Sequence, residues 1–209
     1  MAIDDLPDEH EQSERVRDWL RQNGFGIVAG LLVALGLIFG WRWWQGEQHV
    51  QRVEASVAYQ RMVADLATGD LDDARQQVAA MQGSRYATLA ALELARAQVD
   101  GDDVDGAIQT LEAADASDPA LEPIRRQRLA QLLIAAERAD EAVALLQDAS
   151  DPSGLETLGD AQVALARSDD ARATYGRALA QLDVASPGRG LIELKLADVG
   201  GEPTPNEAL

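Results

Sequence analysis

The residue types that most often carry chemistry are scarce or badly spaced in this 209-residue sequence. Cysteine is absent, which excludes disulfides, thiolate nucleophiles and thiolate metal sites. The two histidines, His10 and His49, lie on either side of a long uncharged stretch, so we do not expect them to share a site. No HExxH motif or Ser/His/Asp set is present, and GLETLGDA at 154–161 lacks the lysine of a phosphate loop. The sequence therefore favours a protein that is not an enzyme and needs no cofactor.

The run DGDDVDG at 100–106 is the best candidate for a metal site, because closely spaced aspartates can bind calcium. Val104 occupies the third ligand position of such a loop, and Leu111 stands where the bidentate glutamate is required. A solvated turn between two helices is the better interpretation, and we predict no metal site.

Acidic residues dominate the charge of the chain. It has 18 Lys+Arg and 36 Asp+Glu, which gives a formal net charge of −18. Nucleic acid is excluded as a partner, because its phosphates repel such a chain. Hydrophobic residues make up 46% and charged residues 26%, as in a globular protein rather than a disordered one.

One segment near the N-terminus is long and apolar enough to cross a membrane. Residues 24–41 read GFGIVAGLLVALGLIFGW without a charge, and a helix of that length spans roughly 27 Å. It ends in Trp41, Trp43 and Trp44, which prefer the headgroup level. These bulky residues argue against a cleaved signal peptide, whose cleavage site needs small residues. We predict a transmembrane helix over 24–44.

Arginines indicate the orientation of this helix. The positive-inside rule places the side with more basic residues in the cytoplasm. Three arginines precede the span and two follow it: Arg15, Arg17 and Arg21, then Arg42 and Arg52. The bias predicts a cytoplasmic N-terminus and, in a bacterium, a periplasmic C-terminal domain.

The head before the span, residues 1–23, carries one narrow apolar stripe. Val16, Trp19 and Leu20 recur at helical spacing, which predicts a short amphipathic helix at the membrane surface. A flexible lead-in is the alternative.

Four glycines share one side of the predicted span. At about 100° per residue, Gly26, Gly30, Gly36 and Gly40 project within an arc of roughly 120°. This arc is a candidate surface for packing against another membrane helix. The alternative is that glycine is simply common in membrane helices.

Residues 45–186 contain a repeat of helix, acidic turn and helix. Four alanines occupy the same position of successive repeats, and the last interval between them is shorter than the first two: Ala74, Ala107, Ala142 and Ala171. The pattern resembles the tetratricopeptide repeat, a helix–turn–helix unit of similar length. In the first helix of that repeat a large residue is followed by a small one, and the matching pairs here are Leu94-Ala95, Leu129-Ala130 and Leu158-Gly159. The second helix of the repeat has a large residue, which matches Leu111, Leu146 and Tyr175. We therefore predict an all-α fold, in which a single N-terminal transmembrane helix is followed by a tetratricopeptide-like α-solenoid.

The segment 187–209 closes this domain. Its run Leu191 to Leu196 fits a strand's alternation about as well as a helix. Because the end of a solenoid needs covering, we interpret it as a capping segment followed by a tail.

Taken in order, these features resemble the YfgM-like family, the ancillary subunit of the bacterial Sec translocon. The resemblance rests on Gln22-Asn23-Gly24, Gly40-Trp41-Arg42-Trp43-Trp44, Ser56-Val57-Ala58-Tyr59-Gln60, the run Tyr86 to Ala95, Arg128-Leu129-Ala130 and Gly159-Asp160-Ala161. It implies a single-pass protein of the bacterial inner membrane that helps transfer translocated proteins to periplasmic chaperones. The implied partners are the Sec translocon channel and a membrane-anchored periplasmic prolyl-isomerase-like chaperone. A periplasmic repeat scaffold for another envelope-assembly or cell-wall complex is the alternative.

The repeat register also predicts a partner-binding groove. In tetratricopeptide repeats the first helix of each unit lines the concave side. This places six residues there: Tyr59, Arg96, Gln127, Gln131, Glu156 and Asp160. Most are polar, so we expect the groove to bind protein segments weakly and reversibly.

Overall fold

The computed structural model describes residues 9–84, 86–114 and 118–202, which are helical throughout apart from turns and loops. Within the long first helix, the side chains of 9–16, 18, 20, 22, 27 and 43–52 lie outside the described part. These include the expected stripe residues Val16 and Leu20 and the expected interface residues Trp43 and Trp44. The chain divides into two compact units, Met1–Val53 and Glu54–Leu209.

The first unit consists of the apolar helix and the segment before it. Helix α1 runs over Glu9–Thr68, and its stretch Asn23–Arg42 is long and apolar enough to cross a membrane. None of that stretch is buried within the protein, and Phe25 and Leu37 are 87% and 70% exposed. Large apolar side chains that no protein atoms cover suit the hydrocarbon of a bilayer.

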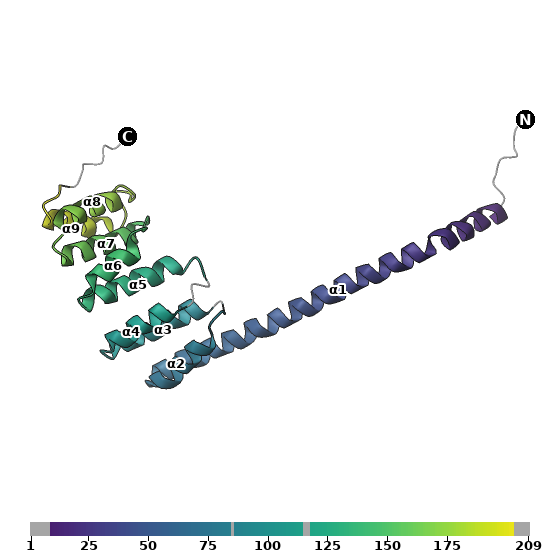
Figure 1. The fold of residues 1–209 in the computed structure, drawn as a ribbon, viewed down its shortest axis with the longest axis horizontal. Coiled ribbons are helices and arrows are strands. Elements are labelled where there is room, and N and C mark those ends of the chain that lie inside the picture. Colours follow the sequence, from purple (N-terminus) through teal and green to yellow (C-terminus); the bar gives the residue numbers. More distant parts are fainter. Residues whose placement is uncertain (1–8, 85, 115–117, 203–209) are drawn as a thin grey trace, which may run out of the picture. The chain divides into compact units, whose positions relative to one another are not determined.

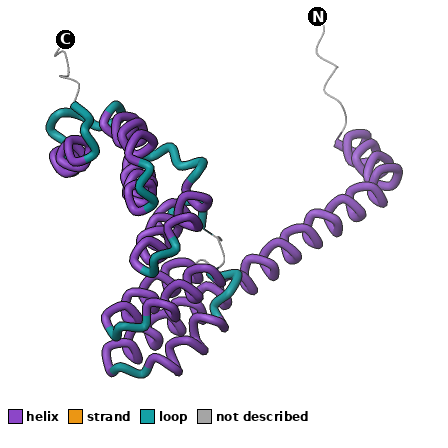
Figure 2. The backbone as a smooth tube through the Cα atoms, turned by 60° about the vertical axis from the view of Figure 1, so that its left-hand side comes forward, coloured by secondary structure: helices purple, strands orange, loops and turns teal. Residues whose placement is uncertain are grey.

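The second unit is a stack of helical hairpins (Figure 1). The end of α1 packs against α2 (Leu71–Ala80) through the shared core of Met62, Ala74 and Val78. Helix α3 (Ala87–Asp100) pairs with α4 (Val104–Ala113). Two further hairpins join α5 (Glu122–Ala135) to α6 (Ala139–Leu146) and α7 (Pro152–Ala164) to α8 (Ser168–Leu179). Helix α9 (Arg189–Asp198) packs on α8. No strand is present in the ranges that the structure describes, as Figure 2 shows. The predicted all-α solenoid is confirmed.

Each hairpin turns at the same point of the repeat. One residue just after the end of the first helix has a positive φ in all four cases: Gly69 (82°), Asp102 (61°), Glu137 (60°) and Ala166 (57°). The next amide then donates to the carbonyl five positions earlier, as Asp103 N does to Gln98 O at 2.8 Å and Arg167 N to Gln162 O at 2.8 Å. This bond closes a Schellman turn. The unequal intervals between the repeat alanines are therefore the intervals between these turns.

Small residues lie where the paired helices meet. The four repeat alanines, Ala74, Ala107, Ala142 and Ala171, are all 0% exposed. One core cluster runs from Met62 to Ala161, and a second joins Leu155 and Tyr175 to Ile192 and Leu196 of α9. The last hairpin therefore buries part of its apolar surface against Ile192 and Leu196 of α9.

Helix α9 ends in the same turn as the first helices. Gly200 has a φ of 76°, and Gly201 N donates to Leu196 O at 2.9 Å. Gly200 follows Ala166, the turn residue of the preceding hairpin, by one full repeat length. Helix α9 thus occupies the place of the first helix of a fifth unit, and the ambiguous run Leu191 to Leu196 is helical.

Candidate interaction site

The first helices of the hairpins build one continuous face of the solenoid, which we call the first-helix face. It comprises α1 from Glu54 onward together with α3, α5, α7 and α9. The stack of Tyr59 on Tyr86 links α1 to the start of α3, and the ion pair of Lys195 with Glu156 links α9 to α7. Helices α5 and α7 pack closely, whereas α3 and α5 touch only lightly. The looser packing of α3 against α5 opens a cleft of about 640 Å³ between them.

The floor of this cleft is apolar. Leu89, Leu92 and Val99 of α3 face Ile124 and Leu132 of α5 across it. Val99 is 37% exposed and Ile124 is 44% exposed, so both contact water. Burial of these side chains against an apolar partner would be favourable. A cleft of this size with an apolar floor can take several side chains of a protein segment.

Charged and amide side chains form the rim of the cleft. Glu93, Arg96 and Asp100 come from α3, and Arg128 and Gln131 come from α5. Arg96 and Asp100 are 77% and 71% exposed and only 4.0 Å apart, so their ion pair is weak. Arg128 donates to Gln131 at 2.9 Å. The rim can therefore exchange its own contacts for those of a partner at low cost.

Tyr59 lies at the N-terminal end of the first-helix face. Its ring stacks on that of Tyr86, with centroids 5.4 Å apart and planes at 24°. Burial, and then the charge of Glu93, raise the pKa of the Tyr59 hydroxyl. This aromatic pair joins α1 to the segment that starts α3.

Three of the six expected groove residues are already engaged by neighbouring helices. Gln127 donates to Thr157 Oγ1 at 3.3 Å, across the α5–α7 contact. Glu156 and Asp160 both accept from Lys195 Nζ of α9, at 2.6 and 2.7 Å, and Asp160 also accepts from the Tyr175 hydroxyl at 2.7 Å. Arg96 and Gln131 therefore lie together at the cleft. Gln127, Glu156 and Asp160 instead bind side chains of neighbouring helices and stabilise the packing of the solenoid.

The two carboxylates raise the pKa of Lys195. Burial by itself lowers the pKa of Lys195, but its hydrogen bonds to Asp160 and Glu156 outweigh burial and hold the pKa above its ordinary value. Nothing local in the sequence signals this cluster, because Lys195 lies 39 residues after Glu156 and in a segment interpreted only as a cap.

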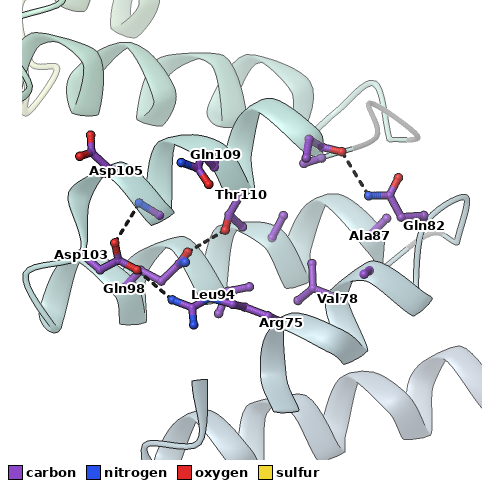
Figure 3. A pocket seen from close by; sticks show the side chains of 15 residues that line it. Arg75, Val78, Gln82, Ala87, Leu94, Gln98, Asp103, Asp105, Gln109 and Thr110 are labelled. Atoms are coloured by element: carbon purple, nitrogen blue, oxygen red, sulfur yellow. Dashed lines mark hydrogen bonds and ion pairs between the residues drawn. The ribbon is translucent and has the colours of Figure 1, made fainter. Parts of the chain in front are cut away.

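A second cleft, of about 430 Å³, lies between α2, α3 and α4 (Figure 3). Its polar side chains bind one another: Arg75 Nη2 donates to Asp103 at 2.8 Å, and Thr110 donates to Gln98 at 2.8 Å. Asp103 also accepts from Gly106 N at 3.0 Å and so caps α4. Asp103 of the aspartate-rich turn thus caps α4 and binds α2, so it stabilises the α3–α4 hairpin and its contact with α2.

Arginines bind the carbonyl ends of helices in this domain, a use that the sequence did not reveal. Arg189 is 9% exposed. It donates to the carbonyl of Leu179, the last residue of α8, at 3.2 Å and to that of Leu182, in the turn that follows, at 2.8 Å. Arg172 donates to Val199 O at 2.7 Å, just after α9. A guanidinium supplies several donors in fixed directions, so it can satisfy such carbonyls and an acid together.

Comparison with known proteins agrees with this architecture. The tetratricopeptide repeat-like domain family matches residues 17–201. The ancillary SecYEG translocon subunit of Escherichia coli (strain K12) is 33% identical over 142 residues, covering 66% of this chain and 69% of that protein. The protein of the same name from Aggregatibacter actinomycetemcomitans is 24% identical over 198 residues, covering 90% of this chain and 96% of that protein.

A solved structure gives the fold alone. The kinesin light chain TPR-like repeats of Podosopora anserina match with a TM-score of 0.54 at 18% identity, covering 71% of this chain and 85% of that one. The domain match spans most of the sequence, and the Escherichia coli relative shares a third of its residues over the matched region. The chain therefore belongs to the YfgM-like family of ancillary SecYEG translocon subunits and carries a tetratricopeptide repeat-like domain.

Proposed function

We propose that this protein is a non-catalytic subunit of the Sec translocon in a bacterial inner membrane. The observation that carries the proposal is its 33% identity to the ancillary SecYEG translocon subunit of Escherichia coli. The apolar stretch Asn23–Arg42 supports a single-pass anchor, and the solenoid supports a role in binding other proteins. In this role the protein helps transfer translocated proteins to periplasmic chaperones, with a membrane-anchored prolyl-isomerase-like chaperone as its second partner.

The cleft between α3 and α5 is the proposed contact for a partner segment. Its apolar floor can bury apolar side chains, and Arg96 and Gln131 at the rim can bind the polar backbone or charged groups of the same segment. A short contact of this kind is weak. A shared membrane raises the effective concentration of the partners, so weak contacts suffice.

Copurification from native membranes tests this site. Ile124→Asp and Val99→Asp place a charge on the exposed floor and should reduce recovery of the translocon channel or the chaperone by about tenfold, because a buried unpaired carboxylate costs well over about 1.4 kcal/mol. Ala144→Asp, at an exposed position of α6, is the matched control and should copurify normally. Full recovery with both cleft variants, or equal loss with the control, rejects the cleft as the contact.

The proposed orientation has the head, residues 1–23, in the cytoplasm and the domain 45–186 in the periplasm. It is supported by the arginine bias across the span. Protease added to spheroplasts should digest the repeat domain and spare the head. A repeat domain that is cut only after the inner membrane is broken would reverse the orientation.

The four span glycines are proposed to pack against a partner's membrane helix. A Cβ built at Gly26, Gly30, Gly36 or Gly40 meets no atom within 4 Å, so Gly→Leu changes leave the helix itself unhindered. Such changes should weaken copurification of membrane partners, because close approach needs small residues. Leu35→Phe, on the opposite side of the helix, should have no effect. Equal effects on both sides would show that the glycines are ordinary composition.

A further inference from the structure

A buried glutamine with an unused donor borders the cleft between α2, α3 and α4. Gln98 lies in the last turn of α3 and is 1% exposed. Its Oε1 accepts from the Thr110 hydroxyl of α4 at 2.8 Å, whereas its Nε2 has no acceptor among the described residues. Figure 3 shows Gln98 and Thr110 at one end of the cleft. A buried amide donor without an acceptor is unfavourable, so this end of the cleft favours a ligand that offers an oxygen.

The repeat does not require a glutamine at this position. Gln98 and Leu133 each lie four positions before the left-handed residue of their turn. In the second helices, Leu145 of α6 corresponds to Thr110 of α4. Leu133 is 3% exposed, so the α5–α6 hairpin packs with an apolar residue there. A hairpin can therefore form without the Gln98–Thr110 pair, which leaves this pair available as part of a binding site.

The cleft follows one face of α3 for most of the length of that helix. Its α3 wall runs from Ala87 through Ala91 and Leu94 to Gln98, over about 16 Å at the helical rise. That is the length of about five residues of extended chain. The alanines of this wall are buried and leave room for a backbone to approach. A volume of about 430 Å³ lies within the range of ligand sites and suits a segment with small side chains.

The charges around the cleft favour a neutral ligand. Arg75 is the cation of the lining, and its terminal nitrogens bind Asp72 and Asp103, both at 2.8 Å. Asp105 adds a carboxylate to the lining, so an anion would be repelled. Gln109, exposed on α4, makes no side-chain hydrogen bond with a described residue. A neutral peptide carbonyl can accept from these glutamine amides without a charge to repel.

We propose that this cleft binds an uncharged, extended segment of another polypeptide, with Gln98 Nε2 donating to one of its backbone carbonyls. Gln109 binds a second backbone group of the same segment, since an amide side chain can both donate and accept. Small side chains of the segment face the alanines of α3, and the others point to water. The two clefts are lined by different faces of α3, so the proposal does not rest on the proposed function.

Peptide binding to the full-length protein in detergent tests the site. A fluorescein-labelled, capped heptapeptide of alanine, serine and threonine should bind, as measured by fluorescence anisotropy. Ala113→Phe fills part of the cleft from an exposed position and should weaken binding by at least about tenfold. Ala144→Phe, at an exposed position of α6, is the matched control and should bind normally. Absence of binding up to about 1 mM peptide, or equal loss with the control, overturns the proposal.

Two further comparisons define the ligand and the cleft. The same peptide with two glutamates in place of serines should bind more weakly, because the cleft has no free cation to pair with them. Tighter binding of the acidic peptide would overturn the assignment of a neutral segment. Ile124→Asp in the α3–α5 cleft should bind the uncharged peptide as the natural chain does. Loss of binding there would place the peptide in the other cleft and overturn the proposal, whereas the copurification result does not bear on it.

A leucine pair tests the buried donor itself. Gln98→Leu with Thr110→Leu copies Leu133 and Leu145 of the α5–α6 hairpin and removes both partners of the internal hydrogen bond together, which preserves the fold. The double variant should bind the peptide at least about tenfold more weakly, with unchanged far-UV circular dichroism. In the 15N-glutamine-labelled natural chain, the Gln98 side-chain signal, identified by its loss in the double variant, should shift on peptide addition. Undiminished affinity in the folded double variant, or an unmoved Gln98 signal at saturation, overturns the proposal.

Discussion

Gly159 of α7 lies directly beneath the ring of Tyr175 of α8, so that a Cβ at position 159 would collide with the ring carbons. Both residues are buried, and the Tyr175 hydroxyl donates to Asp160, the next residue along α7. The small residue of one helix and the large residue of the next therefore form a single contact. This contact sets how closely the two helices of the last hairpin approach.

Gly159→Ala should lower the free energy of unfolding by about 1–3 kcal/mol, because the added methyl group overpacks this contact. The loss should appear even though alanine is the better helix former by about 1 kcal/mol. Gly176→Ala in α8 is the matched control, because a Cβ there meets no atom within 4 Å. It should stabilise the domain slightly. Urea unfolding of both variants measures the difference, and a stabilised Gly159→Ala would contradict the contact.

Lys195→Met should destabilise the C-terminal end of the domain by about 1–3 kcal/mol. It leaves the half-buried carboxylates of Glu156 and Asp160 without their cation, at side-chain exposures of only 21% and 32%. Thermal unfolding measures the loss. Arg96→Met removes a pair that is 4.0 Å long and mostly exposed, so its effect should stay within about 0.5 kcal/mol. Similar losses in the two variants would mean that Lys195 is no more than a surface charge.

Alkaline pH should weaken the same end of the domain. Burial, and then the hydrogen bond to Asp160, raise the pKa of Tyr175 above its ordinary value of 10.0. A group whose pKa is higher in the folded state contributes its full stabilisation below the unfolded value and loses it as the pH rises toward the folded value. Stability should therefore fall above about pH 10, and Lys195, whose pKa is also raised, adds to the fall.

Tyr175→Phe separates the contribution of the hydroxyl to this fall. The variant should be less stable near neutral pH by about 1 kcal/mol, because Asp160 loses a donor. Its stability should nevertheless decline less steeply above about pH 10. Thermal melts across the alkaline range measure both effects. Parallel decline of the two proteins would exclude Tyr175 as a source of the pH dependence.

Arg189→Lys should fail to replace the arginine. Arg189 is 9% exposed and donates to the Glu193 carboxylate and to two carbonyls, one at the last residue of α8 and one in the turn after it. An ammonium group is a compact charge and cannot reach these three acceptors in the fork geometry of a guanidinium. We expect a loss of about 1–3 kcal/mol in unfolding experiments, close to that of Arg189→Met. Full rescue by lysine would show that only the charge matters.

The sequence determined the features that depend on local, periodic patterns. An uncharged apolar stretch predicts a membrane-spanning helix wherever it occurs. Alanines that recur once per repeat length predict hairpins, because only small residues fit where paired helices touch. The unequal spacing of these alanines even located the turns, since each alanine follows its left-handed turn residue by five positions. Fold class and repeat phase could therefore be read without coordinates.

Only the tertiary structure decided which groove residues are free to meet a partner. Arg96 and Glu156 look alike in the repeat register, yet Arg96 is exposed at a cleft and Glu156 is held by Lys195 from 39 residues away. The cleft itself exists because α3 and α5 pack less closely than α5 and α7. Spacing between helices depends on the summed fit of many side chains from distant segments, and side-chain pairing across that spacing follows from it. A periodic pattern gives the face on which a residue lies, but not the neighbour that reaches it.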